Sequence, residues 1–249
     1  MGGALVRGLV HAGYDDVVVY DVDERAFSRV TDLDVETTTD PEIASQPPIV
    51  FVAVKPQLVG IVIDELSLSS DQTVVSIAAG VPTDFVADHT DASVVRIMPN
   101  LAAEWGSMAA AATGELDADV WAILNELGSV VEVDEELMDT ATAVNGSGPA
   151  FVFYLIKSMA AGGIEGGLSP ADARVLAAQT FKGAAEMVLR SEEPIDELID
   201  AVCSPNGTTI EGMAVLDESD VEAVTIEAIE AARERAGELA KEVAHERAA

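Results

Sequence analysis

The sequence predicts an α/β domain with a doubly wound parallel sheet, followed by an all-α domain. Three observations support this fold class. Short apolar, β-branched segments alternate with helical segments up to residue 133. No strand pattern follows Glu135, and long helical patterns then continue to the end of the chain. The length of 249 residues suits one large domain or two smaller ones, and we place a boundary between residues 133 and 134.

The first domain is predicted to begin with a helix, because GGALVRGLVHAG has apolar residues at helical spacing before Gly13. The strands predicted after it are 17–21, 49–54, 73–79, 93–98 and 128–133. The helices between them are 23–31, 57–66, 82–89 and 117–127. A helix that feeds a buried strand usually follows a strand itself. We therefore expect a first strand upstream of Met1, and a chain start that was assigned too late.

The second domain, residues 134–249, is predicted to be helical and to oligomerise. Ser169 and Pro170 have the residue types of an N-cap and a first helical position. The segment 170–190 is apolar on several faces, which indicates burial in a core or against a second subunit. The predicted helices are 135–145, 149–162, 170–190, 194–202, 207–218 and 221–246.

The charge balance disfavours two classes of partner. Forty-five acidic residues against 13 basic ones give a net charge of −32, which repels nucleic-acid backbones and anionic membrane surfaces. The excess is spread along the chain and suits a high-salt cytoplasm, where ions screen the repulsion. The single cysteine, Cys203, also fits a reducing compartment. We expect a cytoplasmic protein with neither nucleic-acid nor membrane partners.

Asp21 and Gly2 indicate a Rossmann-like dinucleotide-binding domain. An acidic residue at the end of the second strand of that fold binds the adenosine ribose, and it repels a 2′-phosphate. Asp21 stands 19 residues after Gly2, which matches the spacing between the third glycine of the G-x-G-x-x-G fingerprint and this acid. Asp21 thus favours NAD over NADP, although Arg25 would soften the repulsion. A solvated strand-end aspartate is the simpler alternative.

Three further segments close predicted strands at the edge of the sheet where ligands bind. Lys55 lies in AVKPQ, after the strand 49–54, and a surface lysine is its plainer interpretation. SIAAGVP and RIMPN close the next two strands, and their small residues allow a nicotinamide to approach the backbone.

Two segments in the second domain suit a small anionic substrate. NGSGPA, residues 145–150, has the composition of a helix start whose free N–H groups would bind a carboxylate. CSPNGTTIEG, residues 203–212, places two threonine hydroxyls at another helix start. Ordinary capped helix entries are the alternative for both. We find no cluster of metal-ligand residues and predict no metal.

Taken together, these segments resemble the pyrroline-5-carboxylate reductase family over essentially the whole chain. The matching stretches are MGGALVRGL, VAVKPQ, SIAAGV, VVRIMPN, NGSGPAFVF, GGLSPADARVLAAQTFKGAAEM and VCSPNGTTIEGM. The pair GSGPA and SPNGTTI is the most specific. The resemblance implies reduction of L-1-pyrroline-5-carboxylate to L-proline with NADPH or NADH. It also implies that the helical domains interlock into dimers, which can form larger homo-oligomers.

The resemblance also assigns residues. Gly2 belongs to the cofactor loop, Ala53, Val54, Lys55 and Pro56 line the cofactor, and Ala79, Gly80 and Asn100 lie near the nicotinamide. Ser204, Gly207, Thr208 and Thr209 would hold the substrate, with Gly146 and Ser147 beside them; Thr209 and Ser204 are the catalytic candidates. A protonated imine needs little acid–base help, so orientation by these residues is the expected contribution.

The chain departs from the family pattern at three places, with Asn145 for Ser, Cys203 for Thr, and Leu101–Ala102 for Thr-Pro. Two alternatives stay open. One is a reductase of another imine or a hydroxyacid, for which Lys182 would be the available lysine. The other is an impaired paralogue that serves as an oligomerisation partner.

Overall fold

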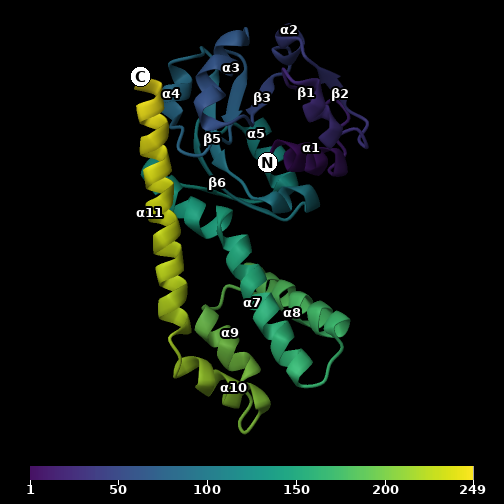
Figure 1. Cartoon of the computed structure of the whole chain (residues 1–249), viewed down its shortest axis with the longest axis vertical. Helices are drawn as coiled ribbons and strands as arrows, with labels where there is room; N and C mark the ends of the chain where they lie inside the picture. Colours follow the sequence, from purple (N-terminus) through teal and green to yellow (C-terminus); the bar gives the residue numbers. More distant parts are fainter. Residues whose placement is uncertain (249) are drawn as a thin grey trace. The chain divides into compact units, whose positions relative to one another are not determined.

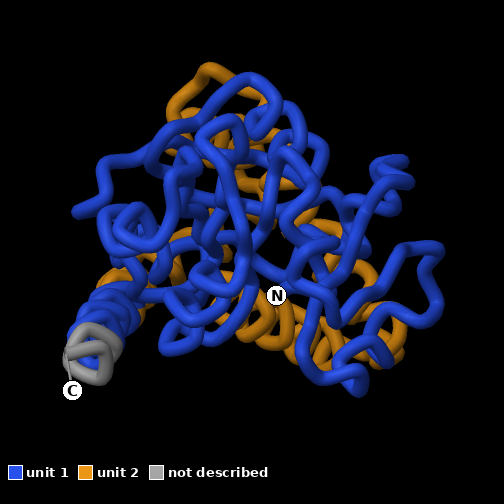
Figure 2. The backbone as a smooth tube through the Cα atoms, turned by 90° about the horizontal axis from the view of Figure 1, so that it is seen from above, with its two compact units in different colours: residues 1–147, 229–249 blue, residues 148–228 orange. Residues whose placement is uncertain are grey.

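The computed structural model describes residues 1–248, with side chains described through Glu242. The chain forms two compact units, shown in different colours in Figure 2. Unit 1 comprises residues 1–147 and 229–249, and unit 2 comprises 148–228. Unit 1 extends past residue 133 because Met138 is fully buried against Met98 and Ala111 of the sheet. The predicted domain boundary after residue 133 stays a prediction.

Unit 1 contains a five-stranded sheet in the order β3-β4-β5-β6-β7 (Figure 1). The first three strands are parallel, β6 is antiparallel to β5, and β7 is parallel to β6. A separate two-stranded parallel sheet pairs β1 with β2. The bounds are β1 Val18–Tyr20, β2 Glu36–Thr38, β3 Ile49–Val52, β4 Thr73–Ser76, β5 Ser93–Met98, β6 Met108–Gly114 and β7 Gly128–Glu132.

Two strands were absent from the sequence prediction. β6 reads Met-Ala-Ala-Ala-Ala-Thr-Gly, and alanine has little preference for strands. Its pairing with both β5 and β7 and its largely buried side chains outweigh that weak preference. β2 has three residues, of which only Thr38 is buried, so it shows no alternation to detect.

Helices pack on the five-stranded sheet of unit 1 and form two apolar cores. Leu5, Leu124 and Leu127 pack with Val95 and Ile97 in one core. A second core contains Val59, Ile63 and Val86 with Val74 of β4. Parallel strands with helices packed against them are the arrangement that the sequence predicted for this domain. The helices are α1 Gly2–His11, η1 Glu24–Arg29, α2 Pro41–Ala44, η2 Pro56–Leu58, α3 Val59–Glu65, α4 Thr83–Ala87, η3 Leu101–Trp105 and α5 Ala118–Leu127.

The segment after β7 is helical, as predicted, but irregular. It consists of η4 (Glu135–Leu137), α6 (Met138–Ala141) and η5 (Thr142–Gly146). The last of these is one turn of π-helix. π-Turns inside helical segments often mark functional sites.

Unit 2 is helical, with α7 Gly148–Glu165, α8 Pro170–Arg190, α9 Ile195–Val202, α10 Thr208–Asp217 and the start of α11 (Val221–Ala248). Ser169 caps α8 as predicted, because its Oγ accepts the Asp172 N–H at 3.1 Å. Only Ala173 and Ala177 of α8 are buried in the single chain. The apolar faces of α7 and α8 are therefore exposed. Within residues 1–248, no helix is both long and apolar enough to cross a membrane.

Candidate active site

The predicted cofactor residues follow the carboxyl ends of strands in unit 1. Asp21 follows β1, residues 53–56 follow β3, Ala79 and Gly80 follow β4, and Asn100 follows β5. In open α/β sheets, ligands bind in the crevice at this edge. The sequence therefore placed these residues at the edge where a dinucleotide is expected.

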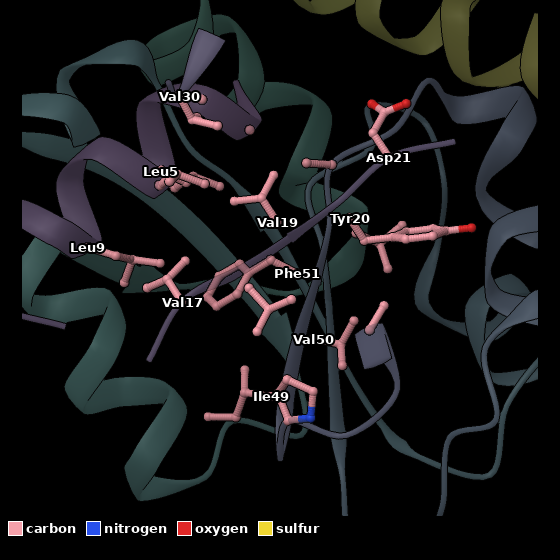
Figure 3. A pocket seen from close by; sticks show the side chains of 18 of the residues that line it. Leu5, Leu9, Val17, Val19, Tyr20, Asp21, Val30, Ile49, Val50 and Phe51 are labelled. Atoms are coloured by element: carbon pink, nitrogen blue, oxygen red, sulfur yellow. The ribbon is translucent and has the colours of Figure 1, made fainter. Parts of the chain in front are cut away.

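Gly2 and Ala53 lie together at this edge. Gly2 is the first residue of α1, and a Cβ built on it would be 3.2 Å from the Cβ of Ala53. The amino end of α1 therefore abuts the end of β3. The first backbone N–H groups of a helix have no partners inside it and favour an anionic group such as a phosphate. Gly2, Ala53 and Asp21 line one cavity of about 440 Å³ (Figure 3).

Asp21 is half-buried, and the loop after it is organised by carboxylates. Asp21 Oδ1 accepts the Asp23 N–H at 2.9 Å. The Asp23 carboxylate in turn accepts Arg25 Nε–H at 2.9 Å and Nη2–H at 2.8 Å. This guanidinium lowers the pKa of the Asp23 carboxyl below its usual value. The Arg25 charge is thus already paired with Asp23, rather than free to soften the repulsion by Asp21.

Lys55 and Gly80 differ in their surroundings. Lys55 is exposed at the start of η2, without a side-chain hydrogen bond or ion pair among the described residues. Gly80 has a φ of +71°, a conformation that side chains rarely adopt, and a Cβ there would lie 2.8 Å from the Cα of Ala240 in α11. The turn after β4 therefore requires glycine, because helix α11 packs directly against it.

Two asparagines connect the end of β5 to the π-turn. Asn100 is buried; its Oδ1 accepts the Ala102 N–H at 3.2 Å and its Nδ2 donates to the Asn145 carbonyl at 3.1 Å. Asn145 Nδ2 donates to the carbonyls of Met98, at 2.6 Å, and Ala109, at 2.8 Å. Asn145 Oδ1 is buried without a hydrogen-bond partner. We call these hydrogen bonds of Asn145 to β5 and β6 the Asn145 clamp. The sequence analysis did not predict the clamp, because it noted Asn145 only as a departure from a family pattern.

The interpretation of residues 145–150 as a helix start with free N–H groups was wrong in part. α7 begins at Gly148, near the predicted place. However, the Ser147 N–H donates to the Thr142 carbonyl at 3.0 Å and is not free. Gly146 ends the π-turn and is exposed, so its backbone stays accessible at the end of β5.

The remaining substrate candidates form one tight turn in unit 2. The Gly207 N–H donates to the Ser204 carbonyl at 2.8 Å, and Asn206 between them has a φ of +59°. Gly207 then precedes α10, whose first two residues, Thr208 and Thr209, are exposed. A side chain at position 207 would collide with Ser204. The turn thus holds these four residues together, whereas Gly146 and Ser147 belong to unit 1.

Arg96 is a second feature that the sequence did not reveal. It is buried in β5 and forms an ion pair with Glu135 of η4. Glu135 Oε2 also accepts the Thr83 hydroxyl at 2.9 Å. Among the described residues, no group of three His, Cys, Asp or Glu side chains is arranged to hold a metal ion.

A dinucleotide crevice in one unit and a helical second unit define the class of NAD(P)-dependent oxidoreductases. Two family models match the chain accordingly. Residues 1–80 match the family described as NADP oxidoreductase coenzyme F420-dependent. Residues 135–239 match pyrroline-5-carboxylate reductase dimerisation.

Individual relatives specify the family. The chain is 38% identical to pyrroline-5-carboxylate reductase of Methanosarcina acetivorans, covering 97% of this chain and 95% of that protein. It is 40% identical to the Escherichia coli enzyme, over 80% of this chain and 78% of that protein. A solved structure of the Coxiella burnetii reductase has a TM-score of 0.84 and 30% identity, over 96% of this chain and 94% of that one. The chain belongs to the pyrroline-5-carboxylate reductase family.

Proposed function

We propose that this chain reduces L-1-pyrroline-5-carboxylate to L-proline with NAD(P)H, the last step of proline biosynthesis. The observation that most strongly supports this activity is the similarity to curated reductases over nearly the full length of the chain. A Plasmodium falciparum relative was solved with NADP bound, has a TM-score of 0.79 and is 28% identical, over 95% of this chain and 93% of that one. The positions of Asp21, Gly2 and Gly80 at one edge of unit 1 fit such a cofactor.

The residues of unit 1 would hold the dinucleotide. Gly2 contributes an amide at the amino end of α1, and Asp21 accepts hydrogen bonds from the adenosine ribose. Residues 53–56, Ala79 and Gly80 line the path towards the nicotinamide. Asn100 keeps the π-turn near the end of β5 through its bond to Asn145. The bound nicotinamide cofactor supplies the hydride.

The turn Ser204–Thr209 would hold the substrate. The hydroxyls of Ser204, Thr208 and Thr209 are donors suited to a carboxylate, and Thr209 is assigned to the ring nitrogen or the carboxylate. The backbone of Gly146 and the hydroxyl of Ser147 are the further candidates. Because a protonated imine is already electrophilic, these residues contribute orientation and exclusion of water rather than a strong base.

Asp21 and Asp23 favour NADH over NADPH. Both carboxylates lie at the end of β1, and Arg25, the cation beside them, is bound by Asp23. A 2′-phosphate would meet negative charge without a free cation to balance it. We expect Asp23→Asn to release Arg25 and shift the preference towards NADPH, whereas Asp15→Asn, outside this loop, should leave it unchanged. An unchanged ratio of kcat/KM values in Asp23→Asn would contradict this assignment.

The exposed apolar faces of α7 and α8 favour a homodimer. Phe153, Tyr154 and Leu189 are each more than 60% exposed in the single chain. Apolar surface of this kind marks a protein interface, and a dimerisation family model matches this region. We also propose that the dimers form larger assemblies. A cytoplasmic location is a separate part of the proposal, and the single free cysteine, Cys203, suits that reducing compartment.

The test is oxidation of NADH and NADPH by the purified chain in high salt with pyrroline-5-carboxylate as substrate. Thr209→Val should lower kcat/KM by roughly 10²-fold because one hydrogen bond to a charged substrate is lost. Thr209→Ser should retain most activity, and Thr225→Val, in the exposed part of α11, should match the wild type. Cofactor binding without turnover on this substrate would support a reductase of another imine or hydroxyacid. A folded protein without cofactor binding would support the impaired paralogue.

A further inference from the structure

A chain of three interacting side chains joins β5 to two helical segments of unit 1. Arg96 of β5 is 5% exposed and forms an ion pair with Glu135 of η4. The second carboxylate oxygen of Glu135 accepts the hydroxyl of Thr83, the first residue of α4, at 2.9 Å. We call Thr83, Arg96 and Glu135 the Glu135 latch. None of the three is a proposed cofactor or substrate residue.

Arg96 lies where the neighbouring strand β4 ends. In the parallel pairing of β4 with β5, Arg96 is the register partner of Ser76, the last residue of β4. The turn after Ser76 contains Ala79 and Gly80 and leads directly into Thr83. The latch therefore fixes the far end of this turn to the strand beside it.

Glu135 belongs to the helical segment that packs on the same face of β5. Side chains alternate between the two faces of a strand, so Arg96 and Met98 share one face. Met98 packs against Met138 of the following helix, α6. The Asn145 clamp holds the end of this segment to the Met98 carbonyl. The segment is thus fixed to β5 along its length, and through Glu135 it also reaches the α4 end of the turn after β4.

The latch is expected to contribute position rather than stability. A buried ion pair adds little net stability, because both ions lose their hydration. Arg96 Nε is also buried without a hydrogen-bond partner among the described residues. The hydrogen bond between a guanidinium and a carboxylate is short and directional, however, so the pair fixes the place of Glu135. Glu135 Oε2 then holds the Thr83 hydroxyl at a defined distance from β5.

We infer that Glu135 is a positioning residue for the nicotinamide end of the cofactor. It acts through Thr83, which sets where the turn with Ala79 and Gly80 lies relative to the end of β5. The inference rests on the proposed function, because that function assigns Ala79 and Gly80 to the nicotinamide side. Hydride transfer needs close and accurate placement of the reacting atoms, and a displacement of about 1 Å can cost roughly 10²-fold in rate.

The adenosine end of the proposed cofactor site lies on other elements. Gly2 begins α1, and Asp21 follows β1 of the separate two-stranded sheet. ADP-ribose, which has the adenosine end of NADH but lacks the nicotinamide, should therefore bind independently of the latch. A comparison of the two ligands separates placement of the nicotinamide from a general loss of stability, because a general loss would weaken both ligands alike.

The experiment measures binding of NADH and ADP-ribose, and kcat with pyrroline-5-carboxylate, in Thr83→Val. This change removes the hydroxyl and nearly keeps the side-chain shape. We expect the Kd for NADH to rise about tenfold and kcat to fall about tenfold, while the Kd for ADP-ribose stays within about twofold of the wild type. Thr83→Ser keeps the hydroxyl and should behave as the wild type. Thr140→Val, at an exposed threonine of α6, is the matched control and should change neither ligand.

Glu135→Gln tests the charge of the latch. Glutamine can still bond to Thr83, but it leaves the buried Arg96 charge unpaired, so the same loss specific to NADH is expected. Glu136→Gln, at the exposed neighbouring residue, is the matched control. Amide exchange provides a readout without any ligand. Exchange at Val81, which is fully buried in the turn, should become about tenfold faster in both Thr83→Val and Glu135→Gln.

Two results would overturn the inference. Equal weakening of NADH and ADP-ribose in Thr83→Val would show a merely structural role, and unchanged exchange at Val81 would show that the hydroxyl does not hold the turn. Failure of the proposed function is distinct from both. A wild type that binds NADH without reducing pyrroline-5-carboxylate would refute the proposed substrate, and the ratio of the two Kd values would still decide the role of Glu135. A wild type that binds neither ligand would refute the proposed function, and amide exchange would still decide whether the latch holds the turn.

Discussion

Replacing Gly8 by alanine tests how α1 is held on the sheet beside the proposed cofactor site. Gly8 is buried where α1 packs on η3 and α5. A Cβ there would lie 2.7 Å from Leu127 Cδ2 and closer still to the carbonyl oxygen of Ala103, inside the 3.0 Å limit that real Cβ atoms keep. The leucine can rotate away, but the backbone carbonyl cannot. Helix α1 must therefore move off η3.

The loss of stability expected for Gly8→Ala follows from two opposing effects. Overpacking a core typically costs about 1–3 kcal/mol, and a backbone clash belongs at the upper end of that range. Alanine regains about 1 kcal/mol of helix propensity over glycine. Gly8→Ala should thus destabilise unit 1 by about 2 kcal/mol. Gly3→Ala, in the same helix with nothing within 4 Å of its Cβ, should be neutral or stabilising by up to about 1 kcal/mol.

The assay is urea unfolding followed by tryptophan fluorescence, which reports unit 1 alone because both tryptophans belong to it. The two variants should differ by about 3 kcal/mol in the free energy of unfolding, or roughly 6–12 °C in the thermal midpoint. Circular dichroism of the whole chain checks that unit 2 is unaffected. Equal stability of Gly8→Ala and Gly3→Ala would refute the close packing of α1 on η3.

Three further predictions concern other parts of the molecule. Asn145→Ser loses the hydrogen bonds to the Met98 and Ala109 carbonyls and should lower the free energy of unfolding in urea by about 1–3 kcal/mol. The exposed control Asn125→Ser should lower it by less than about 0.5 kcal/mol. Similar losses in both variants would contradict the clamp. The Arg7 guanidinium lowers the pKa of Asp32, so this pair stabilises the fold above the ordinary carboxyl pKa and its contribution disappears as the pH falls through the lowered one. The stability difference between wild type and Asp32→Asn should accordingly be present at neutral pH and shrink in acid, and a difference that grows in acid would be inconsistent with the pair. Raising potassium chloride to about 2 M should increase the thermal midpoint, because salt screens the repulsion within a chain of net charge −32; a midpoint that falls with salt would argue against this screening.

The sequence allowed prediction of features that repeat or have a fixed spacing. The apolar runs at 49–54, 73–79 and 93–98 became β3, β4 and β5, because buried parallel strands need apolar residues on both faces. The spacing from Gly2 to Asp21 placed both residues at the same edge of unit 1, since an intervening helix and strand have nearly constant length.

Other features depend on contacts between distant residues and have no local pattern. The alanine-rich β6 is a strand only because β5 and β7 lie beside it. The Asn145 clamp joins the π-turn to carbonyls 47 and 36 residues away. The Arg96–Glu135 pair likewise connects residues that no motif relates. The roles of Ser204 and Thr209 stay predictions, since a turn shows which groups are available but not what they bind.

The discontinuity of unit 1 has a consequence for biosynthesis. Residues 148–228 emerge from the ribosome before 229–249, so unit 2 is complete while unit 1 still lacks its last helical segment. The turn at Gly80 receives its contact from Ala240 only after the residues between them have been translated. Nascent chains arrested before Ala240 should therefore contain an unfinished crevice. The crevice would be completed only when the last helix reaches the strand ends that the cofactor needs.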